Sequence, residues 1–293
     1  MQFRTLLLSC VVMSAAFAAA PAGAVTAFHF STGAPDGKLG ALSQPANDRH
    51  LQTETADDFV LGSRTRLTGA TFTGLLANGA KLSDIKDVEI EIYHVFPGDS
   101  KQPPSGLVTT RQNSPGDHEI AGATRDAGDG SLSFTAQTLN SEFGVGNTVS
   151  NVRGKPEFTG GDGAASGQEV QFEVAFDDPL VLGPDHLFFR PEVELTDGSF
   201  FWLSAPRPIG EDGTPFPAGT TDLQAWIRND RLAPDWVRIG TDVTHQGPFN
   251  MAFSLDGVAG VPEPSSWALM IGGCGLAGAT LRRERRALAS AVR

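Results

Sequence analysis

The sequence predicts an all-β fold, in which a single jelly-roll-like, two-sheet β-sandwich lies between two apolar terminal segments. Apolar and polar residues alternate with a period of two over most of the chain, as in strands that bury one face. Turn residues are frequent, with 34 Gly and 19 Pro among 293 residues, and helical periodicity is nearly absent. Because strand patterns follow one another without a linker, we expect one domain over residues 25–257.

The predicted strands follow from this alternation, taken in order along the chain. In residues 169–176 four apolar side chains occupy every second position, and residues 87–92 and 249–255 show the same pattern. Asp197-Gly198 predicts a tight turn between two further strands. These further strands are residues 26–30, 55–61, 66–75, 131–137, 187–195, 199–204, 223–228 and 236–239. One short helical turn is expected at residues 139–145, and residues 256–260 read as a flexible tether.

Composition excludes several classes of protein. The hydrophobic content of 40% is sufficient for a folded core, and two cysteines are too few for a disulfide scaffold. Of the 22 basic and 34 acidic residues, six and two lie outside residues 25–260, so this body carries 16 and 32 and a net charge of −16. Such a body disfavours nucleic acid as a partner, and it repels anionic polysaccharide unless divalent cations bridge the two.

Residues 1–24 have the features of a secretory signal peptide. One basic residue precedes an apolar run over residues 6–20, and a small-x-small site ends at Ala24. Cleavage there would leave Val25 as the new N-terminus, with residues 18–20 as alternative sites. The run is short for a membrane anchor, and nine residues before Cys10 are too few for a lipoprotein leader. Because Cys10 and Cys274 both lie in the terminal segments, the body has no disulfide.

The C-terminal region combines three elements in order. Residues 258–264 form a tether that ends in Pro262-Glu263-Pro264, residues 265–281 a predicted transmembrane helix, and residues 282–293 a basic tail. The apolar run of about 15 residues spans about 22 Å as a helix, which is short for a bilayer core of about 30 Å unless flanking residues extend it. The positive-inside rule and interfacial anchoring would orient it, through Trp267, Arg282, Arg283, Arg285 and Arg286.

This combination resembles the PEP-CTERM sorting signal of Gram-negative bacteria. The resemblance implies that exosortase, a membrane cysteine protease-transpeptidase, cuts near Glu263, after transient anchoring in the inner membrane. It further implies a final place on the cell surface or in the extracellular matrix of an organism that makes exopolysaccharide. Glu284 interrupts the basic cluster, and residues 287–293 follow it. An ordinary anchor that is never cut is the alternative. The label "ice-binding protein C-terminal domain", which such tails sometimes carry, describes the tail and not ice binding.

The body resembles a set of exported PEP-CTERM proteins without an established activity. The resemblance is carried by Thr55-Ala-Asp-Asp-Phe-Val-Leu61, by Phe200-Phe-Trp-Leu-Ser-Ala-Pro206 and by Asp222-Leu-Gln-Ala-Trp-Ile-Arg228. It implies a fold and a location but no reaction.

No catalytic motif stands out in the body. Its histidines lack the spacing of a zinc site, no Gly-x-Ser-x-Gly elbow occurs, and no cysteine is present for a thiol mechanism. A glycosidase needs only two carboxylates. Candidate pairs are Glu89 with Glu91 and Glu192 with Glu194, which alternate outward on strands with aromatic neighbours. A solvated strand face is the simpler interpretation of both.

Calcium is the metal that the sequence favours, because it takes carboxylate and carbonyl oxygens from loops. The candidate ligands are Asp57, Asp58, Asp126 and Asp129. Adjacent Asp57 and Asp58 face opposite sides of a strand, so one would point inward and need a partner: a metal, backbone amides or an arginine.

Trp226 is the candidate for stacking on a sugar ring. Trp202, Trp226 and Trp236 each lie in a strand with apolar neighbours, so core packing is the leading interpretation of all three. Alternation places Trp226 on the polar face of its strand with Asp222, Gln224 and Arg228, which is a hint of an exposed aromatic. We therefore expect an exported protein with a non-enzymatic binding or structural role in the matrix. The alternative is a secreted carbohydrate-active enzyme that uses a carboxylate pair on the same scaffold.

Overall fold

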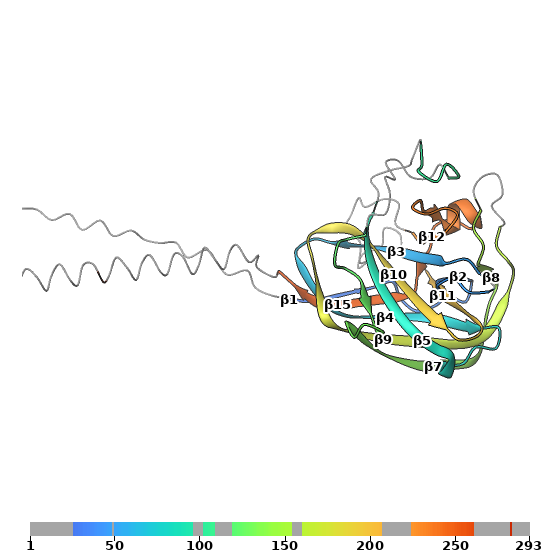
Figure 1. Cartoon of the computed structure of the whole chain (residues 1–293), viewed down its shortest axis with the longest axis horizontal. Coiled ribbons are helices and arrows are strands. Elements are labelled where there is room, and N and C mark those ends of the chain that lie inside the picture. The colour runs from blue at the N-terminus through green and yellow to red at the C-terminus, as the bar shows by residue number, and fades with distance from the viewer. Residues whose placement is uncertain are drawn as a thin grey trace, which may run out of the picture. The chain divides into compact units, whose positions relative to one another are not determined.

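The computed structural model describes residues 26–48, 50–95, 102–108, 119–153, 160–206, 224–260 and Arg282. In this part of the chain the fold is all-β, as the sequence predicts, with two sheets and two short helical turns, η1 (Leu82–Asp84) and η2 (Ile239–Val243). The strands form two layers (Figure 1). Val25–Val261 forms one compact unit.

The larger sheet has nine strands. Its main path is β1 (Thr26–Ser31), β15 (Phe253–Ala259), β4 (Thr65–Ala77), β11 (Ser199–Ala205), β2 (Leu39–Leu42) and β8 (Asn147–Val149). Three strands lie off this path: β14 (Asn250–Met251) on β11, β9 (Ala165–Leu182) on β4, and β7 (Leu132–Val145) on β9. All these pairs are antiparallel except β2 with β8.

The smaller sheet has six strands, and it carries the charged cluster described below. Its order is β13 (Val237–Arg238), β12 (Trp226–Asn229), β3 (Thr53–Leu61), β10 (Asp185–Leu195), β5 (Ile85–His94) and β6 (Arg125–Asp126). Every pair in it is antiparallel.

The main hydrophobic core joins the inner faces of the two sheets. Phe189 of β10 stacks on Phe253 of β15, with ring centroids 5.0 Å apart and planes 7° from parallel. Trp202 of β11 meets both rings at steep angles, and its indole N–H donates to the carbonyl of Ala252 at 2.9 Å. The apolar alternation of the sequence therefore corresponds to inward-facing side chains, which are removed from water.

A second group of aromatic side chains packs on the inner face of the larger sheet, within the main core. Phe72 of β4 and Phe172 of β9 stack with centroids 4.6 Å apart, and Phe200 of β11 meets both edge-on. Gly74 of β4 makes room for this arrangement, because a Cβ atom there would lie 2.0 Å from the ring of Phe200.

Two segments differ from the sequence-based prediction. Residues 139–145, expected as a helical turn, belong to β7, because β9 pairs with them through two irregularities near Asn140. Residues 256–260, expected as a tether, are largely strand: β15 runs to Ala259 between β1 and β4, whose backbones pair with it on both sides. Long-range pairing overrides the local preference of a glycine-containing segment. The alternation pattern does not predict the short strands β2, β6 and β8.

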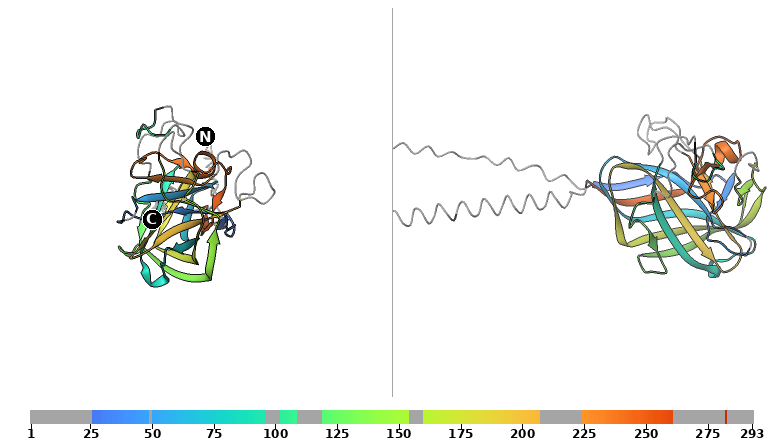
Figure 2. Two further views of the ribbon diagram at one scale, coloured as in Figure 1. Left: turned by 90° about the vertical axis from the view of Figure 1, so that its right-hand side faces the viewer. Right: turned by 45° about the horizontal axis from the view of Figure 1, so that its top comes forward.

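The first and last strands of the body lie side by side. β1 pairs with β15 from Thr26 opposite Ala259 to Ser31 opposite Ser254. The views of Figures 1 and 2 agree that η2 lies toward the opposite end of the body from the outer ends of these two strands. Because the start of β1 lies opposite the end of β15, the first and last described residues of the compact unit lie side by side.

Candidate functional site: a buried ion cluster on the smaller sheet

The most unusual feature of the described residues is a group of charges on the outer face of the smaller sheet. Strand register brings them together: Glu91 of β5 lies opposite Arg190 of β10, and Glu89 lies opposite Glu192. On the side of β10 away from β5, Glu54 of β3 lies opposite Arg228 of β12. Alternation along each strand sends these side chains to the same face, while the intervening apolar residues enter the main core.

Arg190 is the centre of the cluster. Its guanidinium lies 2.7 Å from Glu54, 2.8 Å from Glu89, 2.5 Å from Glu91 and 3.3 Å from Glu192. The arginine side chain is 3% exposed, so these contacts are shielded from water. A planar guanidinium with several donors is the side chain best suited to hold several carboxylates at once.

Arg228 forms a second centre beside the first. It donates from Nε to the carboxylate of Glu54 and from Nη2 to the hydroxyl of Tyr93 at 3.1 Å. Tyr93 in turn donates to Glu91 at 2.5 Å. The guanidinium of Arg228 also lies 4.4 Å from the ring centroid of Trp236, within the range of a cation–π contact. The two arginines are thus linked through Glu54 and through the pair Tyr93–Glu91.

Position relative to the two arginines sets the protonation of each carboxyl group. Burial alone would raise the pKa of Glu54, but Arg190 and Arg228 outweigh it and hold that pKa below its ordinary value. Burial raises the pKa values of Glu89 and Glu91, which Arg190 offsets only in part. Burial, followed by the nearby charges of Glu54 and Glu89, raises the pKa of Glu192 to about 7 despite Arg190.

The cluster therefore has more carboxyl groups than cations. Four glutamates share two guanidinium groups, so full ionisation leaves uncompensated negative charge in a buried place. Glu192 is the group that takes up a proton near neutral pH, and it also accepts a long hydrogen bond from Gln52 at 3.5 Å. Protonation of Glu192 relieves part of this excess negative charge.

An aromatic group covers the flank of the cluster. Phe188 of β10 packs against Trp226 and Trp236 with ring centroids 5.8 and 5.5 Å away. Tyr93 meets Trp236 edge-on at 5.8 Å, and the guanidinium of Arg238 lies 5.0 Å from the ring of Trp226. The outer face of the smaller sheet thus has a hydrophobic cluster of its own.

The hint that Trp226 is an exposed aromatic is wrong, and the core-packing interpretation of this residue is confirmed. The structure places it on the polar face of its strand with Arg228, as alternation predicts, but its side chain is 0% exposed. The polar face of β12 is not a solvent face, because the residues on it pack with one another and with Phe188. Trp202 and Trp236 are also buried, as expected of core residues.

Asp57 and Asp58 do face opposite sides of β3. Asp57 points into the sandwich, where its carboxylate accepts the amide N–H of Asp58 at 2.9 Å and that of Met251 at 2.7 Å. The partner of the inward acid is thus backbone amide, one of the three alternatives. Asp58 points outward and lies 3.2 Å from Nε2 of His186. Both carboxyl groups are fully buried.

Asp126 is the last residue of β6, and Asp129 lies in the turn that follows it. Both are away from Asp57 and Asp58, since β10 and β5 separate β6 from β3 in the sheet. Asp126 accepts the amide of Gly128 at 2.6 Å, and Asp129 accepts that of Ser131 at 2.8 Å. In the described part of the chain, no group of three or more His, Cys, Asp or Glu residues is arranged to hold a metal ion. The four aspartates proposed for calcium therefore do not form one site.

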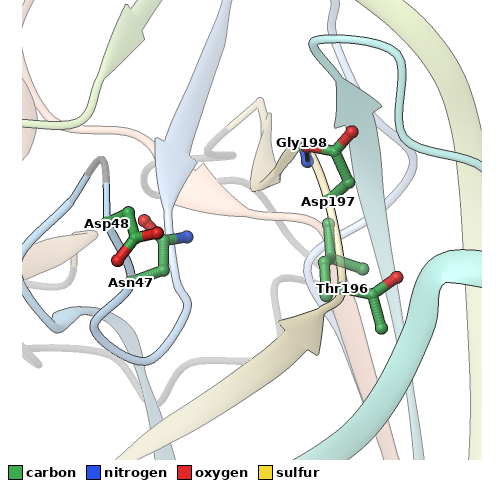
Figure 3. Close-up of a pocket in the computed structure, with 6 residues that line it drawn as sticks. Asn47, Asp48, Thr196, Asp197 and Gly198 are labelled. Atoms are coloured by element: carbon green, nitrogen blue, oxygen red, sulfur yellow. Dashed lines mark hydrogen bonds between the residues drawn. The ribbon is translucent and has the colours of Figure 1, made fainter.

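A small polar pocket lies beside the turn between β10 and β11 (Figure 3). Its volume is about 250 Å³. Asn47 and Asp48 line one side and Thr196, Asp197 and Gly198 the other. Two carboxylates, those of Asp48 and Asp197, belong to the described lining of this pocket.

The sequence pattern indicates three of the four glutamates of the cluster and misses Glu54 and the two arginines as its members. It predicts Glu89, Glu91 and Glu192 as outward acids on a solvated face, whereas the structure partly or largely buries them around Arg190. Arg190 was the available signal, because it lies between Phe189 and Pro191 in a strand that is otherwise apolar or acidic. Glu194, one position further out, is exposed and pairs with Lys86.

The predicted sorting residues lie almost entirely outside the described residues. These are Pro262, Glu263, Pro264, Trp267, Arg283, Arg285 and Arg286, and the predicted signal peptide and transmembrane helix lie outside as well. Arg282 is described and is exposed. No helix within the described ranges has the length and apolar character needed to cross a membrane.

Comparison of the chain with protein-family models, with curated proteins and with solved structures returned no match.

Proposed function

We propose that this chain is an exported cell-envelope or extracellular-matrix protein with a non-enzymatic binding or structural role, sorted through its C-terminal signal by exosortase. The observation that carries the proposal is the pairing of β1 with β15. Thr26 lies opposite Ala259, so the predicted signal peptide and the Pro-Glu-Pro segment join the body at one corner. Both cleavages could then take place at the membrane without disturbing the fold.

Burial of the tryptophans among the described residues supports a non-enzymatic role. The three tryptophans described are buried, and the glutamates near them are committed to Arg190 and Arg228. A jelly roll is the finer description of the fold that we propose, because sequence-distant strands pair antiparallel, as β1 does with β15 and β4 with β9. Exopolysaccharide is the proposed surrounding, with divalent cations between it and the acidic body.

Fractionation of the native host tests the sorting step. We expect Glu263→Ala to leave the protein in the inner-membrane fraction, whereas the unaltered protein reaches the cell surface or the medium. Glu284→Ala is the matched control, because it removes the other acidic residue of the C-terminal region without touching the Pro-Glu-Pro motif. Equal release of both variants would contradict the proposal.

A carbohydrate-active enzyme is the second candidate, and one observation favours it: Glu192, with its pKa raised to about 7, lies in register with Glu89. A carboxyl group of this kind suits a general acid. Screening the body on polysaccharides would support this function if a product forms and Glu192→Gln abolishes it while Glu194→Gln, on the same strand but exposed, does not.

A further inference from the structure

β7 is a long strand at the edge of the larger sheet. It runs over 14 residues, and among the described residues it pairs only with β9. The other edges in the described ranges are shorter: six residues in β1, three in β8 and two each in β6, β13 and β14. Edge strands expose unpaired backbone groups, and natural sheets commonly shorten them for this reason. β7 is the exception in this molecule.

The sequence of β7 lacks the charged and proline residues that commonly protect an edge strand. It contains no lysine, arginine or proline, and Glu142 is its one ionisable residue. The body as a whole has a net charge of −16, as derived above, so a nearly uncharged strand of this length is a local departure. Low charge and the absence of proline are features of strands that accept another strand.

The first half of β7 is regular. From Leu132 opposite Phe176 to Thr138 opposite Val170 the register with β9 is unbroken, and the irregularities begin only beyond Thr138. Seven residues in regular register match the length of an ordinary strand. Ser133, Thr135 and Gln137 present exposed side chains along this half.

Exposed apolar side chains lie on β7 and on the turn that contacts it. Leu139 of β7 is 49% exposed. Leu82 of η1, a turn that lies against β7, is 36% exposed. These are two of the few large apolar side chains that the described part of the body leaves exposed.

We propose that β7 pairs antiparallel with β7 of a second copy, through residues 132–138, so that the two larger sheets become one continuous sheet. Strand addition supplies main-chain hydrogen bonds to both edges. A second copy is the occupant that we propose because residues 132–138 carry no ionisable side chain, so two copies of this segment can pair without placing like charges of β7 against each other, although the two acidic bodies repel one another overall. A two-fold axis places the same uncharged residues on both sides.

Cross-linking tests the proposal without perturbing charge. The body has no cysteine of its own, so a single cysteine at Ser133, Thr135 or Gln137 reports contact between copies. We expect oxidation to join two copies of at least one variant at least tenfold faster than Gln171→Cys. Gln171 lies directly opposite Gln137 but one strand further from the edge, which makes it the matched control. Equal and slow cross-linking of all four variants would overturn the proposal.

Charge placed on the edge provides the second test. In sedimentation velocity of residues 25–261, the unaltered body should dimerise, and Thr135→Lys or Thr135→Glu alone should weaken dimerisation at least tenfold, because like charges meet across the axis. A mixture of these two variants should recover association. Circular dichroism checks that each variant folds. A body that stays monomeric up to about 1 mM, or a dimer insensitive to all these changes, would overturn the proposal.

Discussion

Removal of Arg190 should be among the most damaging single changes in the body. In Arg190→Met the side chain keeps much of its volume, but Glu54, Glu89, Glu91 and Glu192 lose the guanidinium that lies within 3.3 Å of each of them. Loss of one partner from a buried ion pair typically costs about 3–5 kcal/mol, because the remaining charge stays buried and uncompensated. Arg228 still contacts Glu54, so we expect a cost in that range and not a multiple of it.

The pH dependence of this loss identifies its cause. The orphaned glutamates can each take up a proton, so the destabilisation should be largest at pH 8 and smaller at pH 5. Adding Glu54→Gln to Arg190→Met should cost less than the sum of the two single changes, because they remove members of one network. Urea unfolding of residues 25–261 followed by fluorescence measures these free energies.

Lys86→Met is the matched control for Arg190→Met. It breaks an ion pair with Glu194 between the same two strands, but the lysine side chain is 58% exposed and that of Glu194 38%. Exposed pairs contribute about 0–1 kcal/mol. If Arg190→Met cost no more than Lys86→Met, or if its cost did not change between pH 8 and pH 5, the reasoning about the buried cluster would be wrong.

Three further changes test other parts of the structure. The pKa of Glu192 rises from an ordinary 4.5 to about 7 on folding, so the free energy of unfolding should fall as pH rises through that window. Glu192→Gln should flatten this dependence and stabilise the body at pH 8 by up to about 3 kcal/mol, as urea titrations at several pH values would report. Gly74→Ala should cost about 1–3 kcal/mol by overpacking against Phe200, which thermal unfolding would detect as a lower Tm. Asp57→Ala should cost about 1–3 kcal/mol because the buried amide of Met251 loses its acceptor. An unchanged Tm for Gly74→Ala, or an unchanged urea midpoint for Asp57→Ala, would contradict the respective expectation.

The sequence predicts the strands of this fold well because one face of each is apolar. The segments 169–176 and 249–255 illustrate this, since their alternating side chains enter the main core. The sequence predicts secondary structure poorly where long-range strand pairing determines it. Residues 139–145 have no strand pattern and become strand only because β9 lies beside them, and the end of β15 is ordered by β1 and β4.

The ion cluster shows that prediction of the candidate site from local sequence is limited in the same way. Alternation correctly places Glu89, Glu91 and Glu192 on one face of the smaller sheet. Whether that face is open to water depends on which strands are neighbours, and alternation alone does not reveal that Arg190 lies within reach of all three glutamates. A strand with an arginine among aromatic residues is the local signal that could have directed attention there.

Intact mass of the protein recovered from its native host is the most direct test of the proposed sorting. We predict a mature species that begins near Val25 and ends around residues 262–264, with or without an added group, at the cell surface or in the medium. A membrane-bound species that keeps residues 282–293 would contradict the proposal, and the body would then be a tethered domain that acts within reach of the inner membrane.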